Sequence, residues 1–474
     1  MSTVAPPTSL TRAPDAPPRT RALWLVLLAA SLPAFMATLD NLVVTSALPV
    51  MARGLHPTVA QLQWFMDAYT LAFATFMLPA AALGDRIGRR LVFLLGIVVF
   101  AAGSIGGALS TTAAELITTR TVQGIGAAAI LPLSLALLSS AVSPQRRAAA
   151  IGAWGGVTGL GVALGPVVGG AVVQGVSWQT IFWLNAPVAV VAVPLVLAGL
   201  RESRGRAGRI DIPGLLLAGG GVLAAVWAII DANADGWGSA RIVTMLTAAA
   251  VLLVAFVVRQ RRTADPLVPL RLFRSRSFSA SSVTSVVFSA GMFGVVFLLT
   301  QYLQIGQGYS PLAAGVRTLP WTAAPMIVAP IAGLLVARIG VRPLVVSGLV
   351  TLAAAFGWMA LVLNTNPDGY AVLVPALVLA GLGSGLIFAP ISTAVLHGLV
   401  QEDHATASSV NATLREVGVA TGVAVLTAVF LASDGALTPT AFVSGLVPAM
   451  AVGAVLVAVG AAAAAFVPRG AGRA

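Results

Sequence analysis

Residues 39–49 read Leu39-Asp40-Asn41-Leu42-Val43-Val44-Thr45-Ser46-Ala47-Leu48-Pro49 and close an apolar segment that begins near Ala22. At about 27 residues, this segment is longer than the core of a secretion signal and long enough to span a bilayer. Its aspartate is therefore expected within a membrane-spanning helix, where an ionised carboxylate costs about 2.5–3.5 kcal/mol. Such a residue is expected to face protein or water and to have a partner.

The composition of the whole chain also indicates membrane-spanning helices. The 474 residues are 58% hydrophobic and 9% charged, and the mean hydropathy is +0.96. Apolar runs of about 18 or more residues recur along the chain, which is typical of transmembrane helices. The sequence predicts an all-α polytopic membrane protein.

The charges do not indicate a nucleic-acid partner, although the net charge is +12. All 27 cationic side chains are arginine, and most of them fall in short segments between apolar runs. The chain has no cysteine, which excludes disulfides, a thiol nucleophile and thiolate metal sites. Its three histidines have no metal-ligand spacing, and no nucleotide-binding or nucleophile motif is present. We expect no enzymatic activity, no metal and no cofactor.

About fourteen membrane-spanning helices are predicted, between a disordered tail at 1–21 and a short tail at 468–474. The expected helices are 22–50, 62–83, 91–110, 114–142, 147–172, 179–200, 212–232, 241–258, 279–303, 312–337, 343–363, 371–396, 404–431 and 440–467.

Arginine placement supports this count and orients the chain. With the N-terminus inside, only Arg53, Arg241 and Arg317 fall outside, and Arg120 and Arg415 lie within helices; every other arginine is inside. Because positive residues concentrate on the cytoplasmic side, both termini are expected in the cytoplasm of a cell-membrane protein.

An internal repeat divides the chain. The segments Ala81-Ala82-Leu83-Gly84-Asp85-Arg86-Ile87-Gly88-Arg89-Arg90 and Gly333-Leu334-Leu335-Val336-Ala337-Arg338-Ile339-Gly340-Val341-Arg342 align as a degenerate copy displaced by eight helices. Two extra helices between two six-helix bundles explain that offset. The predicted divisions are an N-terminal bundle at 22–200, a linker with the extra helices at 201–278, and a C-terminal bundle at 279–467.

Several motifs in order resemble those of the fourteen-helix drug:proton antiporters of the major facilitator superfamily. They are residues 39–49, 84–90, 116–128, 161–170, 266–278 and 302–320. One departure is Ala81, where that family usually has glycine. The resemblance implies the major facilitator fold, export of drugs or antibiotics, and the proton gradient as energy source.

Asp40 has two candidate partners at its own depth. Helical geometry places Asp40, Asp67 and Arg120 within about 6 Å of one level in the outer half of the membrane. A guanidinium beside a carboxylate keeps it ionised, and separating the pair raises its proton affinity. These residues are therefore predicted to couple protons to transport, a role that the resemblance also implies for Arg120. The alternatives are a structural aspartate, a structural ion pair, and a location of Asp67 at the wet helix mouth.

Glu416 is the deepest acid of the second half, with Arg415 beside it. Glu416 is predicted as a second proton-coupling group; it could equally bind a cationic substrate or pair with a neighbouring helix. Arg415 is interpreted as a helix-packing cation.

Two motifs are predicted to act on conformation. Gly161, Gly165 and Gly169 share a helical face and favour close helix packing, and Pro166 bends that helix. The resemblance places this motif, with Gly170, at the seam between the halves, where it limits leak.

The loop after the second helix is predicted as a conformational latch, with simple loop stabilisation as the alternative. Its carboxylate, Asp85, can pair with nearby arginines or with a helix N-terminus across the seam. The latch residues are Gly84, Asp85, Arg86, Gly88, Arg89 and Arg90.

Some polar and aromatic side chains within helices are possible linings of a central cavity, although most such residues form core or face lipid. The candidates are Asn41, Gln123, Trp154, Phe288, Phe293, Trp321, Met326, Trp358 and Phe388.

The function predicted is proton-coupled export of small hydrophobic molecules, cationic ones included, by a monomer in the cell membrane. A narrow exporter of one natural product is the alternative, and a membrane-embedded enzyme or receptor is a remote one. No nucleophile–base pair or metal-ligand set within the helices favours the enzyme.

Overall fold

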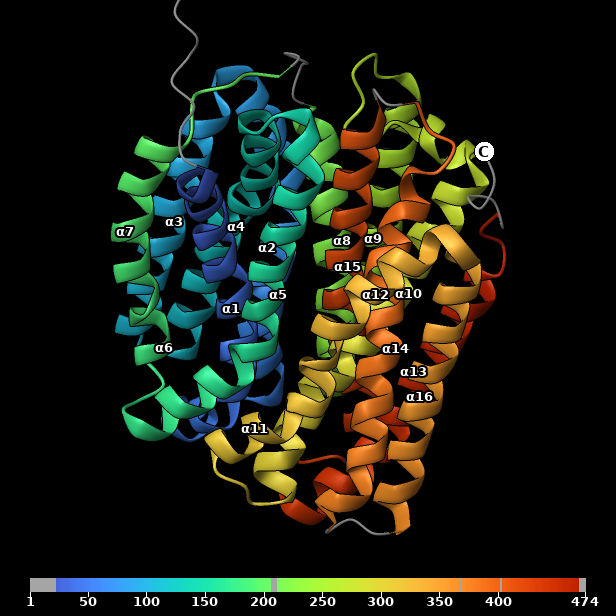
Figure 1. The fold of residues 1–474 in the computed structure, drawn as a ribbon. Helices are drawn as coiled ribbons and strands as arrows, with labels where there is room; N and C mark the ends of the chain where they lie inside the picture. The colour runs from blue at the N-terminus through green and yellow to red at the C-terminus, as the bar shows by residue number, and fades with distance from the viewer. Residues whose placement is uncertain (1–22, 206–210, 366–368, 401–402, 469–474) are drawn as a thin grey trace, which may run out of the picture.

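A computed structural model describes residues 23–205, 211–365, 369–400 and 403–468 of the chain (Figure 1). The predicted tail at 1–21 lies outside these ranges, as do residues 469–474 of the predicted tail at 468–474. The described residues form helices and connecting loops without a strand, and fourteen of their helical segments are long and apolar enough to cross a membrane. The prediction of an all-α protein with fourteen spans is confirmed.

The helices run as follows. The first group is α1 (Leu23–Leu55), α2 (Val59–Ile87), α3 (Arg89–Leu109), α4 (Ala113–Ala141), α5 (Pro144–Gly175), α6 (Thr180–Trp183) and α7 (Asn185–Gly199). Two more helices follow, α8 (Ile212–Asp235) and α9 (Ala240–Arg262). The last group is α10 (Arg276–Gln301), α11 (Pro311–Thr322), α12 (Ala324–Ile339), α13 (Val341–Thr365), α14 (Tyr370–Leu396), α15 (His404–Ala432) and α16 (Pro439–Ala464).

Two spans predicted as continuous helices are broken. The span at 180–199 consists of α6 and α7, and the span at 311–339 consists of α11 and α12. A proline follows each break by a few residues, Pro187 in the first span and Pro325 in the second. Because proline has no amide hydrogen and its ring crowds the preceding turn, the helix is interrupted there.

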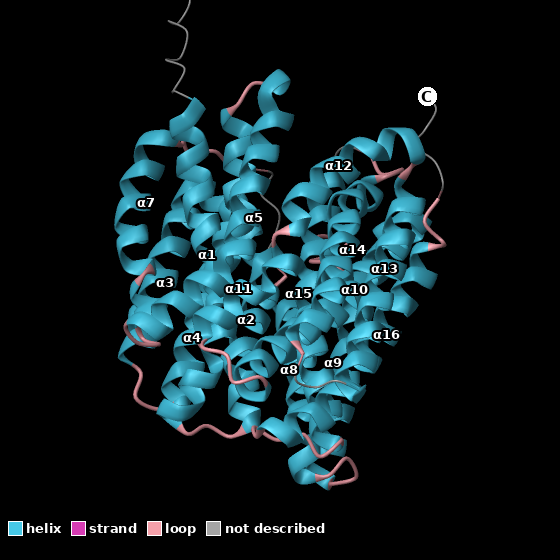
Figure 2. Cartoon of the chain, turned by 60° about the horizontal axis from the view of Figure 1, so that its bottom comes forward, coloured by secondary structure: helices cyan, strands magenta, loops and turns pink. Residues whose placement is uncertain are grey.

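The helices pack as two groups, α1–α7 and α10–α16, with α8 and α9 alongside them (Figures 1 and 2). Helix α8 lies against the seam between the groups, because its Val226 and Ile230 pack with Leu71 of α2 and Ala424 of α15. Helix α8 therefore covers the junction of α2 and α15, and α9 packs on α8.

Ion pairs hold α8 and α9 together at both ends. Asp211, at the start of α8, accepts hydrogen bonds from the Gly214 amide (2.9 Å), Arg259 Nε (2.7 Å) and Gln260 Nε2 (2.7 Å). Burial opposes ionisation of Asp211, but these hydrogen bonds outweigh it and lower the pKa of the carboxyl. At the other end, Arg241 of α9 pairs with carboxylates of α8.

The two ends of the bundle differ in charge and in packing. We call the end with the α2–α3, α4–α5, α7–α8, α9–α10, α12–α13 and α14–α15 loops the arginine-rich end. At the opposite end, α5 and α11 approach closely across the seam, since Gly170 lies against the Pro311 backbone and Gly315 against the Pro166 carbonyl. A side chain at either glycine would collide with backbone, so these contacts require glycine.

Hydrogen bonds between the groups add to this closure. Gln304 Nε2 donates to the Ser46 carbonyl (2.8 Å), and Gln174 Oε1 accepts from the Leu312 amide (3.3 Å). The end opposite the arginine-rich end is therefore shut in this conformation.

Gly315→Leu is expected to open the shut end, because the leucine side chain cannot fit against Pro166. Ser46 is fully buried at this seam, and the chain has no native cysteine, so Ser46→Cys reports opening without background. Its labelling by a membrane-impermeant maleimide should rise roughly tenfold or more. A tenfold rise corresponds to a change of about 1.4 kcal/mol in the equilibrium between the shut and open conformations of this end.

Gly333→Leu is the matched control, because a Cβ at Gly333 makes only an ordinary contact with Ala389 at 3.6 Å. Equal labelling in both variants would show that the α5–α11 contact does not hold this end shut.

Candidate functional site

A buried ion pair joins α1 and α4 near the middle of the bundle. Arg120 Nη1 donates to Asp40 Oδ2 at 2.5 Å, and the two side chains are 0% and 1% exposed. A bare carboxylate would be unstable in this environment, but the opposite charge and the hydrogen bond compensate for its lost hydration. The predicted pairing of Asp40 with Arg120 is present.

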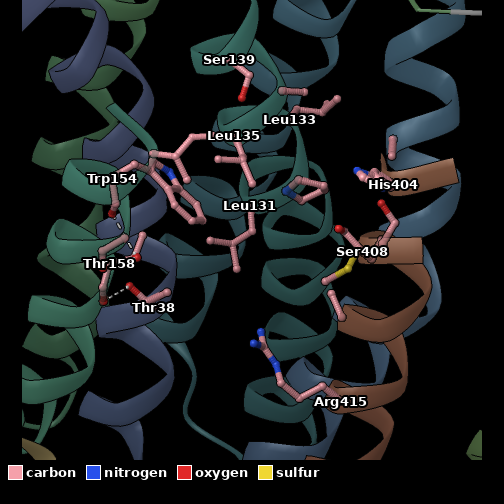
Figure 3. Close-up of a pocket in the computed structure, with 18 of the residues that line it drawn as sticks. Thr38, Leu131, Leu133, Leu135, Ser139, Trp154, Thr158, His404, Ser408 and Arg415 are labelled. Carbon is pink, nitrogen blue, oxygen red and sulfur yellow. Dashed lines mark hydrogen bonds between the residues drawn. The ribbon is translucent and has the colours of Figure 1, made fainter. Parts of the chain in front are cut away.

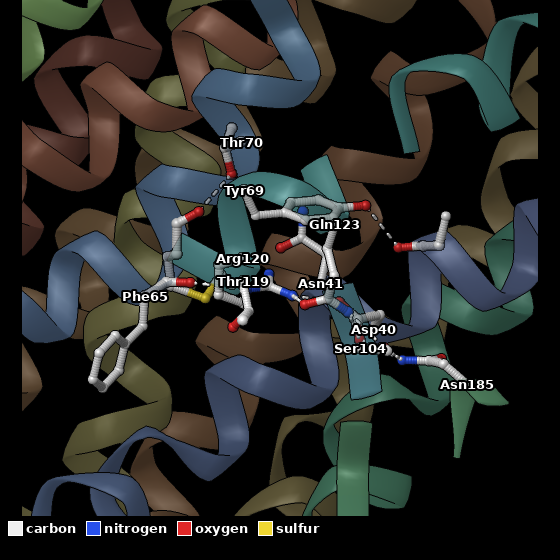
Figure 4. A network of polar contacts seen from close by, with 12 residues as sticks. Asp40, Asn41, Phe65, Tyr69, Thr70, Ser104, Thr119, Arg120, Gln123 and Asn185 are labelled. Atoms are coloured by element: carbon white, nitrogen blue, oxygen red, sulfur yellow. Dashed lines mark hydrogen bonds and ion pairs between the residues drawn. The ribbon is translucent and has the colours of Figure 1, made fainter. Parts of the chain in front are cut away.

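Two amide side chains bind the other carboxylate oxygen, and a serine links the two amides (Figure 4). Asp40 Oδ1 accepts from Asn185 Nδ2 of α7 at 2.7 Å and from Gln123 Nε2 of α4 at 3.2 Å. Both amides also donate to Ser104 Oγ of α3, at 2.8 and 2.7 Å. Four helices therefore contribute to one hydrogen-bonded network.

Helix α2 fixes the guanidinium. Arg120 Nε donates to the Phe65 carbonyl at 3.0 Å, and the Tyr69 ring lies under the guanidinium, 4.4 Å from ring centre to carbon (Figure 4). The face of an aromatic ring attracts a cation. Gly124 permits this approach, since a Cβ there would collide with the Tyr69 carbonyl.

Asp67 lies apart from this network. It is 1% exposed, and neither of its carboxylate oxygens has a hydrogen-bond partner among the described residues. The helical increment of 100° places it on the face of α2 that carries Trp64 and Leu71, which packs against α8 and α15. The alternative of a wet helix mouth is therefore wrong, because neighbouring helices cover Asp67.

A cavity of about 2020 Å³ separates the two groups of helices. Its lining includes Asp85, Ser139, Asp265 and His404, so it opens at the arginine-rich end, and it reaches Trp321 in the interior. Figure 3 shows the side chains of α4 and α5 facing those of α15 across the gap. This conformation is open at one end and shut at the other.

Four of the predicted lining residues line the cavity, namely Trp154, Trp321, Met326 and Phe388. Trp321 is only 1% exposed and forms part of the wall.

The other predicted lining residues lie elsewhere. Gln123 is fully buried in the ion-pair network, and Phe293 is partly buried against the hydrophobic core. Asn41 is one turn deeper than Thr38, the α1 residue that lines the cavity. Phe288 packs edge-on against Phe388 (5.4 Å), and Trp358 is exposed on the outer surface.

Within the described part of the chain, Arg415 and Glu416 pair with each other and not with a neighbouring helix. Arg415 Nη2 donates to Glu416 Oε1 at 3.2 Å. The Arg415 side chain is 42% exposed and lines the cavity, whereas that of Glu416 is 10% exposed. The interpretation of Arg415 as a helix-packing cation is wrong, because its guanidinium points into the cavity (Figure 3).

Comparison with known proteins identifies this architecture. The family model of the Major Facilitator Superfamily matches residues 30–423. The chain belongs to the major facilitator superfamily.

Two relatives within the superfamily are resistance proteins. The chain is 34% identical over 428 residues to the tetracenomycin C resistance and export protein of Streptomyces glaucescens, covering 90% of this chain and 79% of that one. It is 37% identical over 414 residues to the multidrug resistance protein Stp of Mycobacterium tuberculosis, covering 87% and 76%.

A solved structure supports the fold. A POT family transporter crystallised with 5-aminolevulinic acid aligns with a TM-score of 0.69 at 15% identity, over 92% of this chain and 94% of that one.

The predicted latch loop of this superfamily member packs within its own half. Asp85 Oδ1 accepts from Arg89 Nε at 2.6 Å, and the Glu202 carboxylate accepts from the amides of Arg90 (2.9 Å) and Leu91 (3.2 Å) at the start of α3. An acidic side chain at a helix N-terminus is stabilising. No hydrogen bond or ion pair of Asp85 to the other half occurs among the described residues, so the loop is not fastened across the open end.

The other latch residues have separate surroundings. Gly84 lies against Leu133 of α4, Gly88 has a φ of +134°, and Arg86 is exposed.

The glycines of α5 make contacts with two different helices. Gly161, Gly165 and Gly169 lie against α1 within one half, at Thr38, Leu42 and Val43. Pro166 and Gly170 instead meet α11 at the seam. The motif therefore joins α1 to the α5–α11 closure.

Ser104, Asn185 and Tyr69 were not predicted from the sequence as residues of this site. Asn185 is an amide within an apolar segment, and such a residue is a candidate for a functional contact. That signal could have drawn attention to Asn185. The serine and the tyrosine gave no comparable signal, since both are common in membrane helices.

Arg120→Met is expected to destabilise the protein strongly, by about 3–5 kcal/mol, because it leaves the Asp40 carboxylate buried without an opposite charge. Asn185→Ala should cost less, about 1–3 kcal/mol, because Gln123 and Arg120 still bind the carboxylate. Thermal unfolding in detergent measures both. Equal losses of thermal stability would show that the ion pair is not the main support of the network.

Proposed function

We propose that this chain is a secondary transporter that exports hydrophobic drugs or antibiotics across the cytoplasmic membrane in exchange for protons. The proposal rests on a large, mainly apolar cavity that is open at one end and on the fully buried ion pair of Asp40 and Arg120. The resistance and export functions of the two relatives support the same function.

The arginine-rich end faces the cytoplasm in this proposal. Arginine concentrates on the cytoplasmic side of membrane proteins, which places both termini inside the cell. The cavity is then open to the cytoplasm, where a hydrophobic compound can enter it before export.

The cavity is the substrate site. Trp154, Met326 and Phe388 provide apolar surface, and hydroxyls such as Thr38 and Ser408 provide polar contacts. Ligand pockets usually have volumes of about 300–1,000 Å³, so the volume here includes the vestibule as well as the site.

Transport proceeds by alternating access, in which two halves rock around a central site. The α5–α11 contact opens toward the outside as the arginine-rich end closes. On closing, the carboxylate of Asp85 exchanges its Arg89 partner for a group in the other half, which makes this loop the latch.

Asp40 is the main proton-coupling group. A proton on Asp40 cancels the attraction that holds Arg120 Nη1, and the freed guanidinium then favours a different packing of α1, α2 and α4. Neither Asp40 nor Arg120 lines the cavity in this conformation. Protons and substrate are therefore coupled through the movement of helices, without direct competition for one group.

Asp67 and Glu416 are further acids of this mechanism. Burial of an ionised carboxylate without a partner is very unfavourable, so Asp67 carries a proton while the α2–α15 seam is packed. Opening of the seam gives Asp67 access to water and to proton exchange. Glu416, which lies beside Arg415 on α15 in the other half, is a further proton-exchanging group.

A narrow exporter of one natural product is the second candidate, because one relative is a tetracenomycin C export protein. A substrate panel separates the two, since a broad exporter responds to many dyes and antibiotics and a narrow one to a single compound. In either case we propose a monomer that needs no cofactor beyond the proton gradient.

Asp40→Asn is expected to abolish export driven by a pH gradient, because the amide cannot exchange a proton. Substrate uptake into proteoliposomes under an imposed pH gradient measures this. Asp231→Asn is the matched control, since it removes a carboxylate from an ion pair with Arg241 at the far end of α8. If Asp40→Asn still builds a substrate gradient from a pH gradient, Asp40 is not the coupling group.

A further inference from the structure

We infer that the cavity selects aromatic substrates with an acidic group over cationic ones, and that Arg415 binds that acidic group. The inference rests on the proposed transport function and specifies its substrate class. The prediction from the sequence included cationic drugs among the substrates, and this inference makes them the disfavoured class.

Arg415 lies deep in the cavity. It is the twelfth residue of α15, a helix of 29 residues, and is therefore about 17 Å from the start of a helix about 43 Å long. Its side chain extends from α15 into the gap between the halves (Figure 3). A substrate that enters from the arginine-rich end therefore meets this guanidinium near the middle of the membrane.

The guanidinium has unused hydrogen-bond capacity. Arginine has five N–H donors in a planar fork that matches a carboxylate. Among the described residues, Arg415 uses one of them on a side chain, the 3.2 Å bond to Glu416. The remaining donors are available to an acidic group in the cavity.

The orientation of the Arg415–Glu416 pair exposes its positive end. The arginine side chain is 42% exposed and the glutamate side chain is 10% exposed. A ligand in the cavity therefore meets the cation first, whether or not Glu416 is ionised.

No acid among the described residues offers a comparable contact to a cation at this depth. Asp40, Asp67 and Glu416 do not line the cavity. The acids that do line it are Asp85, Asp211 and Asp265, and all three lie at its mouth. Of these, Asp85 and Asp211 already pair with Arg89 and Arg259.

Three probes with one aromatic scaffold test the inference on the full-length protein in detergent: 9-anthracenecarboxylate, its amide, and protonated 9-(aminomethyl)anthracene. Because a charge-assisted hydrogen bond adds to the ring contacts, the carboxylate should bind roughly tenfold tighter than the amide. The amine should bind most weakly. Failure of the carboxylate to bind, or tighter binding of the amine, would overturn the inference without any variant.

Arg415→Gln should reduce carboxylate affinity to that of the amide and change amide affinity by less than about threefold. Arg415→Lys should keep part of the preference, since it keeps the charge and loses the planar fork. Arg241→Gln, which removes an exposed arginine from the shut end, should change nothing. A carboxylate preference that survives in Arg415→Gln would contradict the assignment of Arg415.

This experiment separates the inference from the proposed function. Binding is measured without a proton gradient, so a charge preference can fail while pH-driven export is intact. Conversely, an intact preference in a protein that cannot use a pH gradient would disprove the proton coupling alone.

Discussion

The burial of one carboxylate in a helix bundle constrains much of the N-terminal half. Asp40 is tolerated there because Arg120 supplies the opposite charge, and Gln123 and Asn185 supply hydrogen bonds. These contacts in turn fix the relative positions of α1, α4 and α7, while Arg120 holds α2 through the Phe65 carbonyl. A change in the charge of this single group therefore affects the packing of several helices at once.

Asp40 and Arg120 lie outside the cavity lining, and this position limits how proton binding and substrate binding could be coupled. Asp40 does not line the cavity, so in the proposed mechanism substrate and proton act on each other through the arrangement of the helices. Helix α5 is well placed for this, because Gly165 packs on α1 and Gly170 packs on α11 across the seam. A shift of α1 is therefore transmitted to the contact that shuts the end opposite the arginine-rich end.

The sequence predicted the features that the membrane makes costly. Long apolar runs are needed for every span, and a charge in the membrane needs a partner, so the fourteen helices and the Asp40–Arg120 pair could be inferred. The direction in which a side chain points could not, since Gln123 and Arg415 gave no sign of which neighbour they face. The helix breaks before Pro187 and Pro325 were also missed, because hydropathy does not register a local loss of hydrogen bonds.

The central claim is that the charge of Asp40 sets the balance between the two conformations. Spin labels on Ser140→Cys of α4 and Val400→Cys of the α14–α15 loop report the opening of the arginine-rich end, and their separation can be measured by pulsed EPR at two pH values without substrate. We predict a distance distribution that shifts with pH in the wild-type background and shifts much less in Asp40→Asn, where only Asp67 and Glu416 remain as proton-exchanging acids of the mechanism. The same shift in both backgrounds would contradict the account.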